Sequence, residues 1–347
     1  MAKRRIGILT AGGDCPGLNA VIRGVGKASF ERFGGDVRFI GIADGFSGLI
    51  NGEYREMERG DFSGILTLGG TILGSSRTPY KSMRSIGSDN IDKVKAMKDN
   101  YAKMRLDALI TLGGNGTHKS ADMLCKEGLN VIGLPKTIDN DIWGTDVTFG
   151  FHTAVDTATA VIDRLHTTAA SHGRVIVVEL MGNKAGWLTL YAGMAGGADV
   201  IIIPEIPYFD EAVAEAVLHR TETGADFSIV CVAEGAGSKR SAQSGKTEAQ
   251  RIADEINRRC RMETRVTVPG LILRGGSPSA YDRLLSTQLG VYAAKLLETE
   301  TYGVSAAFID GAVTHNPLSV AASKTKLVPS GHQLTAAARD IGISFGD

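Results

Sequence analysis

Short apolar runs recur along the chain, and most of them end close to a glycine or a proline. The runs are almost continuous in Val, Ile, Leu and Ala, which is typical of β-strands that are covered on both faces. We expect strands at residues 6–10, 37–42, 108–112, 131–135, 175–181, 200–204, 228–233 and 305–309.

Amphipathic segments separate these runs, and we expect helices at residues 90–104, 153–171, 210–221 and 248–261. Strands that alternate with helices predict an α/β fold with a parallel, doubly wound sheet. Ligands bind at the carboxyl ends of the strands in such sheets. The glycine pairs lie largely at those ends, so we expect ligand-binding loops there.

The length of 347 residues is sufficient for two α/β domains. A polar, glycine-bearing stretch at residues 139–150 precedes a long helical pattern, and it predicts a domain break near Gly150. Residues 235–246 (GAGSKRSAQSGK) are poor in apolar side chains and are interpreted as a surface loop.

Charge and cysteine usage narrow the class of protein. Lys plus Arg and Asp plus Glu both number 38, so we expect neither nucleic acid nor an acidic membrane surface as a partner. No run of about 18 uncharged apolar residues is present, so no membrane-spanning helix is expected. The cysteines are far apart and form no C-x-x-C pair, which favours a reducing, cytoplasmic location.

The first predicted strand leads into TAGGDCPGLN at residues 10–19. Pro16 suits an early helical position, and Gly12 and Gly13 expose backbone amides at the positive end of the helix, which predicts an anion site. The sequence is not G-x-G-x-x-G, so a dinucleotide site is poorly supported.

The sequence contains two further glycine loops, one that follows a predicted strand and one that carries hydroxyls and an arginine. GGNGT at residues 113–117 could hold a second phosphate with its backbone amides, and GTILGSSR at residues 70–77 adds Arg77 as a phosphate clamp. Neither GGNGTHKS nor the GKT at residues 245–247 fulfils the G-x-x-x-x-G-K-[ST] pattern, so a P-loop NTPase is not indicated.

The densest group of charges is PKTIDND at residues 135–141, which ends the fourth predicted strand. In an extended segment Asp139 and Asp141 point to the same side. Phosphoryl transfer needs positive charge around the moving group and a carboxylate that orients the acceptor hydroxyl. An Asx-rich turn with solvated charges remains the alternative. Arg174, Arg265 and Arg274 lie near predicted strand ends, and together they would form a phosphate anchor.

In this order the motifs resemble those of the phosphofructokinase family, in particular its bacterial mixed-substrate ATP/pyrophosphate group. The resemblance rests on GGDCPGLNAVIRG, GGTILGSSR, GGNGT, PKTIDNDIWGTDVTFGF, VIDRLHTTAASHGRV, VELMGN, AEG, ETRVTVPG and LRGGSPSAYDR. It implies two Rossmann-like three-layer domains with mostly parallel sheets. It also implies the glycolytic transfer of the γ-phosphoryl group of ATP to the 1-hydroxyl of fructose 6-phosphate.

The same resemblance implies a donor domain for ATP and Mg²⁺ at residues 1–150 plus 272–328, and a sugar-phosphate domain at residues 151–271 plus 329–347. It implies a homotetramer or homodimer with shared active sites, in which Arg265 reaches across a subunit interface. Mg²⁺ is the implied cofactor, with Asn115 and Asp141 as candidate ligands.

The resemblance also implies individual roles. Asp139 would take the proton from the acceptor hydroxyl, with Thr137 and Arg77 as the other catalytic residues. The implied donor-binding residues are Gly12, Gly13, Arg77, Gly114, Asn115, Gly116, Thr117 and Lys136. The implied sugar-phosphate residues are Thr137, Asp139, Asp141, Arg174, Met181, Gly182, Glu234, Arg265 and Arg274.

Several positions depart from the family pattern. Asn115 stands where an acidic residue associated with Mg²⁺ is usual, Asn183 replaces an arginine, and Leu271 replaces a polar residue near the sugar phosphate. Gly116 leaves room for ATP, whereas an aspartate there favours pyrophosphate; Lys136 is shared with pyrophosphate users. We therefore favour ATP, with a pyrophosphate-dependent enzyme as the alternative, a catalytically weak regulatory subunit as the second, and a Rossmann oxidoreductase as a distant third.

Overall fold

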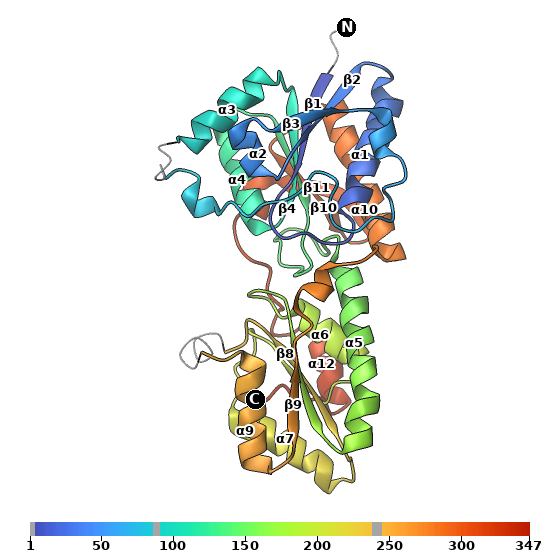
Figure 1. Cartoon of the computed structure of the whole chain (residues 1–347), viewed down its shortest axis with the longest axis vertical. Helices are drawn as coiled ribbons and strands as arrows, with labels where there is room; N and C mark the ends of the chain where they lie inside the picture. The colour runs from blue at the N-terminus through green and yellow to red at the C-terminus, as the bar shows by residue number, and fades with distance from the viewer. Residues whose placement is uncertain (1–3, 86–90, 238–244) are drawn as a thin grey trace. The chain divides into compact units, whose positions relative to one another are not determined.

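The computed structural model describes residues 4–85, 91–237 and 245–347, and the chain forms two compact units. Unit 1 comprises residues 1–137, 142–152 and 274–325. Unit 2 comprises residues 138–141, 153–273 and 326–347. Each unit therefore contains segments that are far apart in the sequence (Figure 1).

Unit 1 is built on a seven-stranded sheet in the order β11-β10-β5-β4-β1-β2-β3. Its strands are β1 (Arg4–Thr10), β2 (Val37–Ile42), β3 (Tyr54–Met57), β4 (Ala108–Gly113), β5 (Val131–Pro135), β10 (Val304–Ile309) and β11 (Ala312–Pro317). The central strands pair in parallel, and the two edge strands, β3 and β11, pair antiparallel to their neighbours. The carboxyl ends of β1, β4 and β5 thus lie at one edge of the sheet.

Helices cover both faces of this sheet. On one face α2 (Phe46–Asn51), α3 (Lys93–Lys103), α4 (Asn115–Lys126) and α11 (Leu318–Ala321) bury apolar side chains against β2, β4 and β5. On the other face α1 (Leu18–Phe33) and α10 (Ala280–Glu298) lie side by side (Figure 1). Their backbones approach closely, because a Cβ built on Gly290 would lie 2.6 Å from the carbonyl oxygen of Val21. The short helices η1 (Arg59–Phe62) and η2 (Tyr80–Ser82) complete the unit.

Unit 2 contains a parallel four-stranded sheet in the order β7-β8-β6-β9. Its strands are β6 (Val175–Leu180), β7 (Val200–Ile202), β8 (Ser228–Ala233) and β9 (Thr264–Thr267). Alternate side chains of β6 face α7 (Asp210–Glu222) and α9 (Glu248–Cys260), as the period of a strand requires. The other face is covered by α6 (Trp187–Ala195). Among the described residues, the remaining helices are α5 (Phe151–His172), η3 (Gly270–Arg274) and α12 (Gln333–Asp340).

The predicted α/β fold with mostly parallel, two-face-covered sheets is confirmed. All eight predicted strands form, within two residues at each end, whereas β3, β9 and β11 were not predicted. The predicted helix at 90–104 forms as α3, and its first residue lies outside the described residues. Most of the predicted loop at 235–246 also lies outside them. Among the described residues, no helix has both the length and the apolar character needed to cross a membrane.

Candidate active site

The loop after β1 gathers two cations in unit 1. The ammonium of Lys136 donates to the carbonyl oxygen of Gly13, and the guanidinium of Arg274 donates to the carbonyl of Asp14 at 3.2 Å. An added Cβ on Gly13 would lie 2.0 Å from an Arg274 nitrogen, so a larger residue here would have to displace the Arg274 guanidinium. Gly12 has φ +85°, a conformation that suits glycine. The predicted anion loop is therefore in contact with two positively charged side chains from other parts of unit 1.

Arg77 lies on a loop that is bonded to the first one. The amide of Gly12 donates to the carbonyl of Ser76 at 3.0 Å, and the Ser75 hydroxyl donates to the Gly12 carbonyl at 2.6 Å. Arg77 is exposed, so its guanidinium is accessible to an anion at this edge of the sheet. The structure thus brings together two glycine loops whose bonded residues Gly12 and Ser75 are 63 positions apart in the sequence.

The third loop starts α4. Gly114 is its N-cap residue, so the amides of Asn115, Gly116 and Thr117 lie in the first turn at the positive end of the helix. An added Cβ on Gly116 would meet no heavy atom within 4 Å, so the space beside this position is open. A helix start with open space beside it suits a phosphate group.

A buried histidine supports the start of α4. His118 is 1% exposed; its Nδ1 lies 3.0 Å from the Gly114 carbonyl and its Nε2 lies 2.8 Å from the Ser305 hydroxyl. A carbonyl only accepts, so Nδ1 carries the proton and Nε2 accepts from Ser305. Burial, together with the charge of Lys136, lowers the pKa of His118 to about 4. The imidazole is therefore neutral near pH 7.

The motif at residues 135–141 is divided between the two units. Lys136 and Thr137 end the β5 region of unit 1, where the Thr148 hydroxyl donates to the Thr137 carbonyl at 2.7 Å. Asp139 and Asp141 belong to unit 2, where Asp141 is 4% exposed. The predicted donor-binding cation, Lys136, thus lies in unit 1. The predicted base, Asp139, lies three residues later in the sequence and belongs to unit 2.

A small cavity in unit 2 brings together several predicted sugar residues. It has a volume of about 120 Å³, and its lining includes Met181, Glu234 and Leu271. Glu234 accepts hydrogen bonds from the amides of Gly182 at 3.1 Å and Asn183 at 2.7 Å. These bonds fix the loop after β6. Leu271 is 75% exposed, so the departure from a polar residue places an apolar side chain at the cavity.

The predicted phosphate-binding arginines fall into two groups. Arg174 and Arg265 both pair with Glu263 in unit 2, the former at 2.9 Å, and the Arg174 guanidinium lowers the pKa of that carboxyl. Arg274 instead belongs to unit 1, beside Gly13. No signal in the sequence predicted the pairing of Arg174 with Glu263, whereas Arg265 lies two residues from Glu263.

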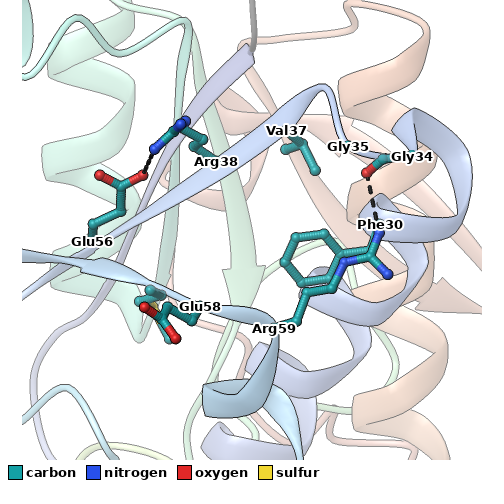
Figure 2. Close-up of a pocket in the computed structure, with 9 residues that line it drawn as sticks. Phe30, Gly34, Gly35, Val37, Arg38, Glu56, Glu58 and Arg59 are labelled. Carbon is teal, nitrogen blue, oxygen red and sulfur yellow. Dashed lines mark hydrogen bonds and ion pairs between the residues drawn. The ribbon is translucent and has the colours of Figure 1, made fainter.

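A further cavity, of about 520 Å³, lies in unit 1 near the C-terminal end of α1 (Figure 2). Two of its charged side chains, Arg38 and Glu56, pair with each other, and the Arg59 guanidinium lies 4.8 Å from the Phe30 ring centroid (Figure 2). None of the predicted site residues lines this cavity.

The described residues contain no group of three or more His, Cys, Asp or Glu side chains that could hold a metal ion. The oxygen-bearing candidates Asn115 and Asp141 are hard ligands of the kind that Mg²⁺ accepts. Asn115 belongs to unit 1 and Asp141 to unit 2, so a magnesium ion bound by either residue would need most of its ligands from a bound polyphosphate and water.

The fold and these loops define an α/β protein with candidate anion sites at the carboxyl ends of parallel strands, where proteins of this class bind phosphate groups. The phosphofructokinase family matches residues 5–297, and the chain belongs to this family. It is 53% identical, over 100% of this chain and 98% of the relative, to the ATP-dependent 6-phosphofructokinase of Spirochaeta thermophila. It is 47% identical, over 99% and 100%, to ATP-dependent 6-phosphofructokinase 3 of Bacteroides thetaiotaomicron.

Two solved structures share the fold of this chain. Phosphofructokinase of Pichia pastoris in the T-state superposes with a TM-score of 0.84 at 30% identity, covering 99% of this chain and 37% of the other. Pyrophosphate-dependent phosphofructokinase of Nitrosospira multiformis gives 0.83 at 18% identity, covering 100% and 93%. The latter shows the shared fold alone.

Proposed function

We infer that this chain is an ATP-dependent 6-phosphofructokinase, which transfers the γ-phosphoryl group of ATP to the 1-hydroxyl of fructose 6-phosphate. The observation that carries this conclusion is the identity of 53% over the whole chain with a relative of that name. The glycine loops and the cations Lys136 and Arg77 would supply the positive groups that a polyphosphate donor needs.

The reaction needs one proton transfer and one exchange of P–O bonds. Asp139 would accept the proton of the 1-hydroxyl while the hydroxyl oxygen forms a bond to the γ-phosphorus. The bond between that phosphorus and the β–γ bridging oxygen breaks, and ADP leaves with the electron pair. Thr137 and Asp141, which flank Asp139 in sequence, would line the same centre.

The donor would lie along the three loops of unit 1. The amides of Gly12, Gly13 and residues 114–117 would bind its phosphate oxygens, because they lie at loop turns and a helix start. Lys136 and Arg77 would stabilise the negative charge that spreads over the transferred group. Gly116 favours ATP as the donor, because no side chain fills the space beside it.

Mg²⁺ is proposed as the cofactor, bound as a complex with ATP. When bound, it neutralises charge on the β- and γ-phosphates. Asp141 and Asn115 are the residues of this chain that would contribute oxygen ligands. An amide is a weaker ligand than a carboxylate, so Asn115 would give a looser metal site than an acidic residue.

The sugar phosphate would lie in unit 2. Met181, Gly182 and Glu234 would hold the sugar at the 120 Å³ cavity. Arg174, Arg265 and Arg274 are the arginines proposed to bind the 6-phosphate. Glu263 now pairs with Arg174 and Arg265, so a phosphate would have to compete with this carboxylate.

We further propose a cytoplasmic homotetramer or homodimer with shared active sites. The free cysteines Cys15, Cys125, Cys231 and Cys260 suit a reducing compartment. Mixing Asp139→Asn and Arg265→Ala subunits tests the shared site: hybrids should recover activity that neither variant has alone. Hybrids as inactive as the parents would contradict a contribution of Arg265 across the interface.

Coupled assays with ATP or pyrophosphate as sole donor, each with fructose 6-phosphate, test the main proposal. Turnover with ATP is expected; turnover with pyrophosphate alone would establish the pyrophosphate-dependent alternative. Asp139→Asn should abolish turnover while calorimetry still detects fructose 6-phosphate binding. Binding without turnover in the unmodified protein would instead indicate a regulatory subunit.

A further inference from the structure

Asn140 lies between the two acidic residues of the motif and has an unusual backbone. Its φ is +51°, in the left-handed region, and the residue is 3% exposed. Asparagine tolerates this region better than most residues, but the conformation still has to be held by its surroundings. The direction of Asp139 and Asp141 depends on this backbone, because the left-handed residue sets the turn between them.

Lys326 contacts this turn from a segment 186 residues away in sequence. Its ammonium donates to the side-chain oxygen of Asn140 at 2.9 Å. Its backbone amide donates to the carbonyl of Asp141 at 2.8 Å. A single residue of unit 2 therefore holds both the side chain of Asn140 and the backbone that follows it.

Lys326 is itself fixed by α6 and by the chain after β7. The indole Nε1 of Trp187 donates to the Lys326 carbonyl at 3.0 Å, and the ammonium lies 5.3 Å from the Trp187 ring centroid. Two residues on, the amide of Val328 donates to Glu205 at 3.0 Å, and Glu205 also accepts from the Gly186 amide at 2.9 Å. The cation is thus presented to Asn140 from a well-anchored segment.

We propose that Lys326 is a positioning residue for the phosphoryl transfer, which acts through Asn140 by holding the turn that aims Asp139. This inference rests on the proposed role of Asp139 as the base. A neutral residue at 326 would leave the buried amide oxygen of Asn140 without this charged donor. The turn would then relax, and a displacement of about 1 Å at a reacting group lowers the rate on the order of 100-fold.

The first experiment separates positioning from binding. Lys326→Met should lower kcat at least about 10-fold while the KM for fructose 6-phosphate changes less than about threefold, because only alignment in the transition state is lost. Lys326→Arg, which keeps the charge and donors, should recover most of the kcat. The matched control is Lys324→Met: Lys324 also lies over a tryptophan, 3.6 Å from the Trp143 ring centroid, and should leave kcat within about twofold of the unmodified protein.

A double-mutant cycle tests the route through Asn140. Glycine adopts the left-handed region without a side-chain partner. In an Asn140→Gly background, Lys326→Met should therefore change kcat less than about twofold, against at least about 10-fold in the unmodified background. An equal loss in both backgrounds would overturn the proposal.

Two controls keep the outcomes distinct. Circular dichroism and thermal melting of each variant identify loss of folding. If Lys326→Arg is folded but as inactive as Lys326→Met, the proposal is overturned. Asp139→Asn is measured in parallel: if it keeps full turnover, the proposed base is wrong. If it is inactive while Lys326→Met retains normal kcat, Asp139 stands and the role of Lys326 is refuted.

Discussion

Gly116 is the residue on which donor choice depends. It lies in the first turn of α4, and no heavy atom lies within 4 Å of an added Cβ. A carboxylate placed there would bring negative charge to the amides that are proposed to bind the donor. Repulsion between this carboxylate and the phosphates of the donor would exclude the donor as effectively as a lost contact.

We expect Gly116→Asp to lower kcat/KM for ATP about 100-fold, equivalent to about 3 kcal/mol of transition-state stabilisation. The KM for fructose 6-phosphate should change little, because the residues proposed to hold the sugar itself, Met181, Gly182 and Glu234, belong to unit 2. Gly331→Asp is the matched control, since Gly331 also has open space around it and contributes to no proposed site. ATP kinetics unchanged by Gly116→Asp would show that this position does not face the donor.

For individual residues, the sequence predicts candidate catalytic and binding residues better than the residues that position them. Glycines and charges at strand ends mark the loops, because their residue types are unusual in those places. Lys326 and Glu263 have no such signal: their partners, Asn140 and Arg174, are remote in sequence. Only the folded chain brings these pairs together. The roles assigned to the predicted site residues stay predictions.

Among the elements, α7 and α9 are joined by a buried ionic cluster. Arg251 on α9 pairs with Asp210 and with Glu248, each at 2.8 Å, and the side chain of Glu248 is 1% exposed. Tyr208 donates to the same Glu248 carboxylate. A buried carboxylate that loses its cation is strongly destabilising.

Arg251→Met should therefore lower the free energy of unfolding by about 3–5 kcal/mol, because Glu248 would be left charged and buried. Urea unfolding followed by circular dichroism measures the change. Arg258→Met on the same helix is the control: Arg258 is 61% exposed, and its pair with Glu255 should contribute less than about 1 kcal/mol. Equal effects of the two substitutions would show that Glu248 finds other compensation.

The strands that the hydrophobic pattern did not predict all lie at the edge of a sheet. β3, β9 and β11 are edge strands, and each pairs with a neighbour on one side. An edge strand is partly exposed and needs no continuous apolar run; the sequence of β11, AVTHNP, is mostly intermediate in exposure. The central strands are buried on both faces, and for that reason their apolar runs predicted them.

In the whole molecule, the chain enters each unit more than once: residues 274–325 belong to unit 1 and residues 326–347 to unit 2. Periodicity alone does not reveal these returns, because it reports which face of an element is buried and not which sheet the element joins. Lys326 is the first residue after the last change of unit. Its contact with Asn140 therefore depends on the complete path of the chain.

Stability against acid should depend on His118, whose pKa burial lowers from 6.5 to about 4. In the unfolded chain the imidazole regains its ordinary pKa, so between these values the unfolded state binds more protons. His118 thus contributes full stability above about pH 6.5, and this contribution, about 3 kcal/mol, is lost as the pH falls toward 4. Burial raises the pKa of Asp199 and Glu248, and these carboxyls act in the opposite direction.

A comparison with His118→Gln isolates the histidine from those carboxyls. Urea unfolding at a series of pH values from about 7.5 to 4 should give a smaller loss of stability for the variant than for the unmodified protein. The difference between the two curves should develop between pH 6.5 and 4, whatever the variant's absolute stability. Parallel curves would mean that His118 titrates alike in both states. In that case the neutral form of His118, bonded to Gly114 and Ser305, would not account for the connection between the start of α4 and β10 across this pH range.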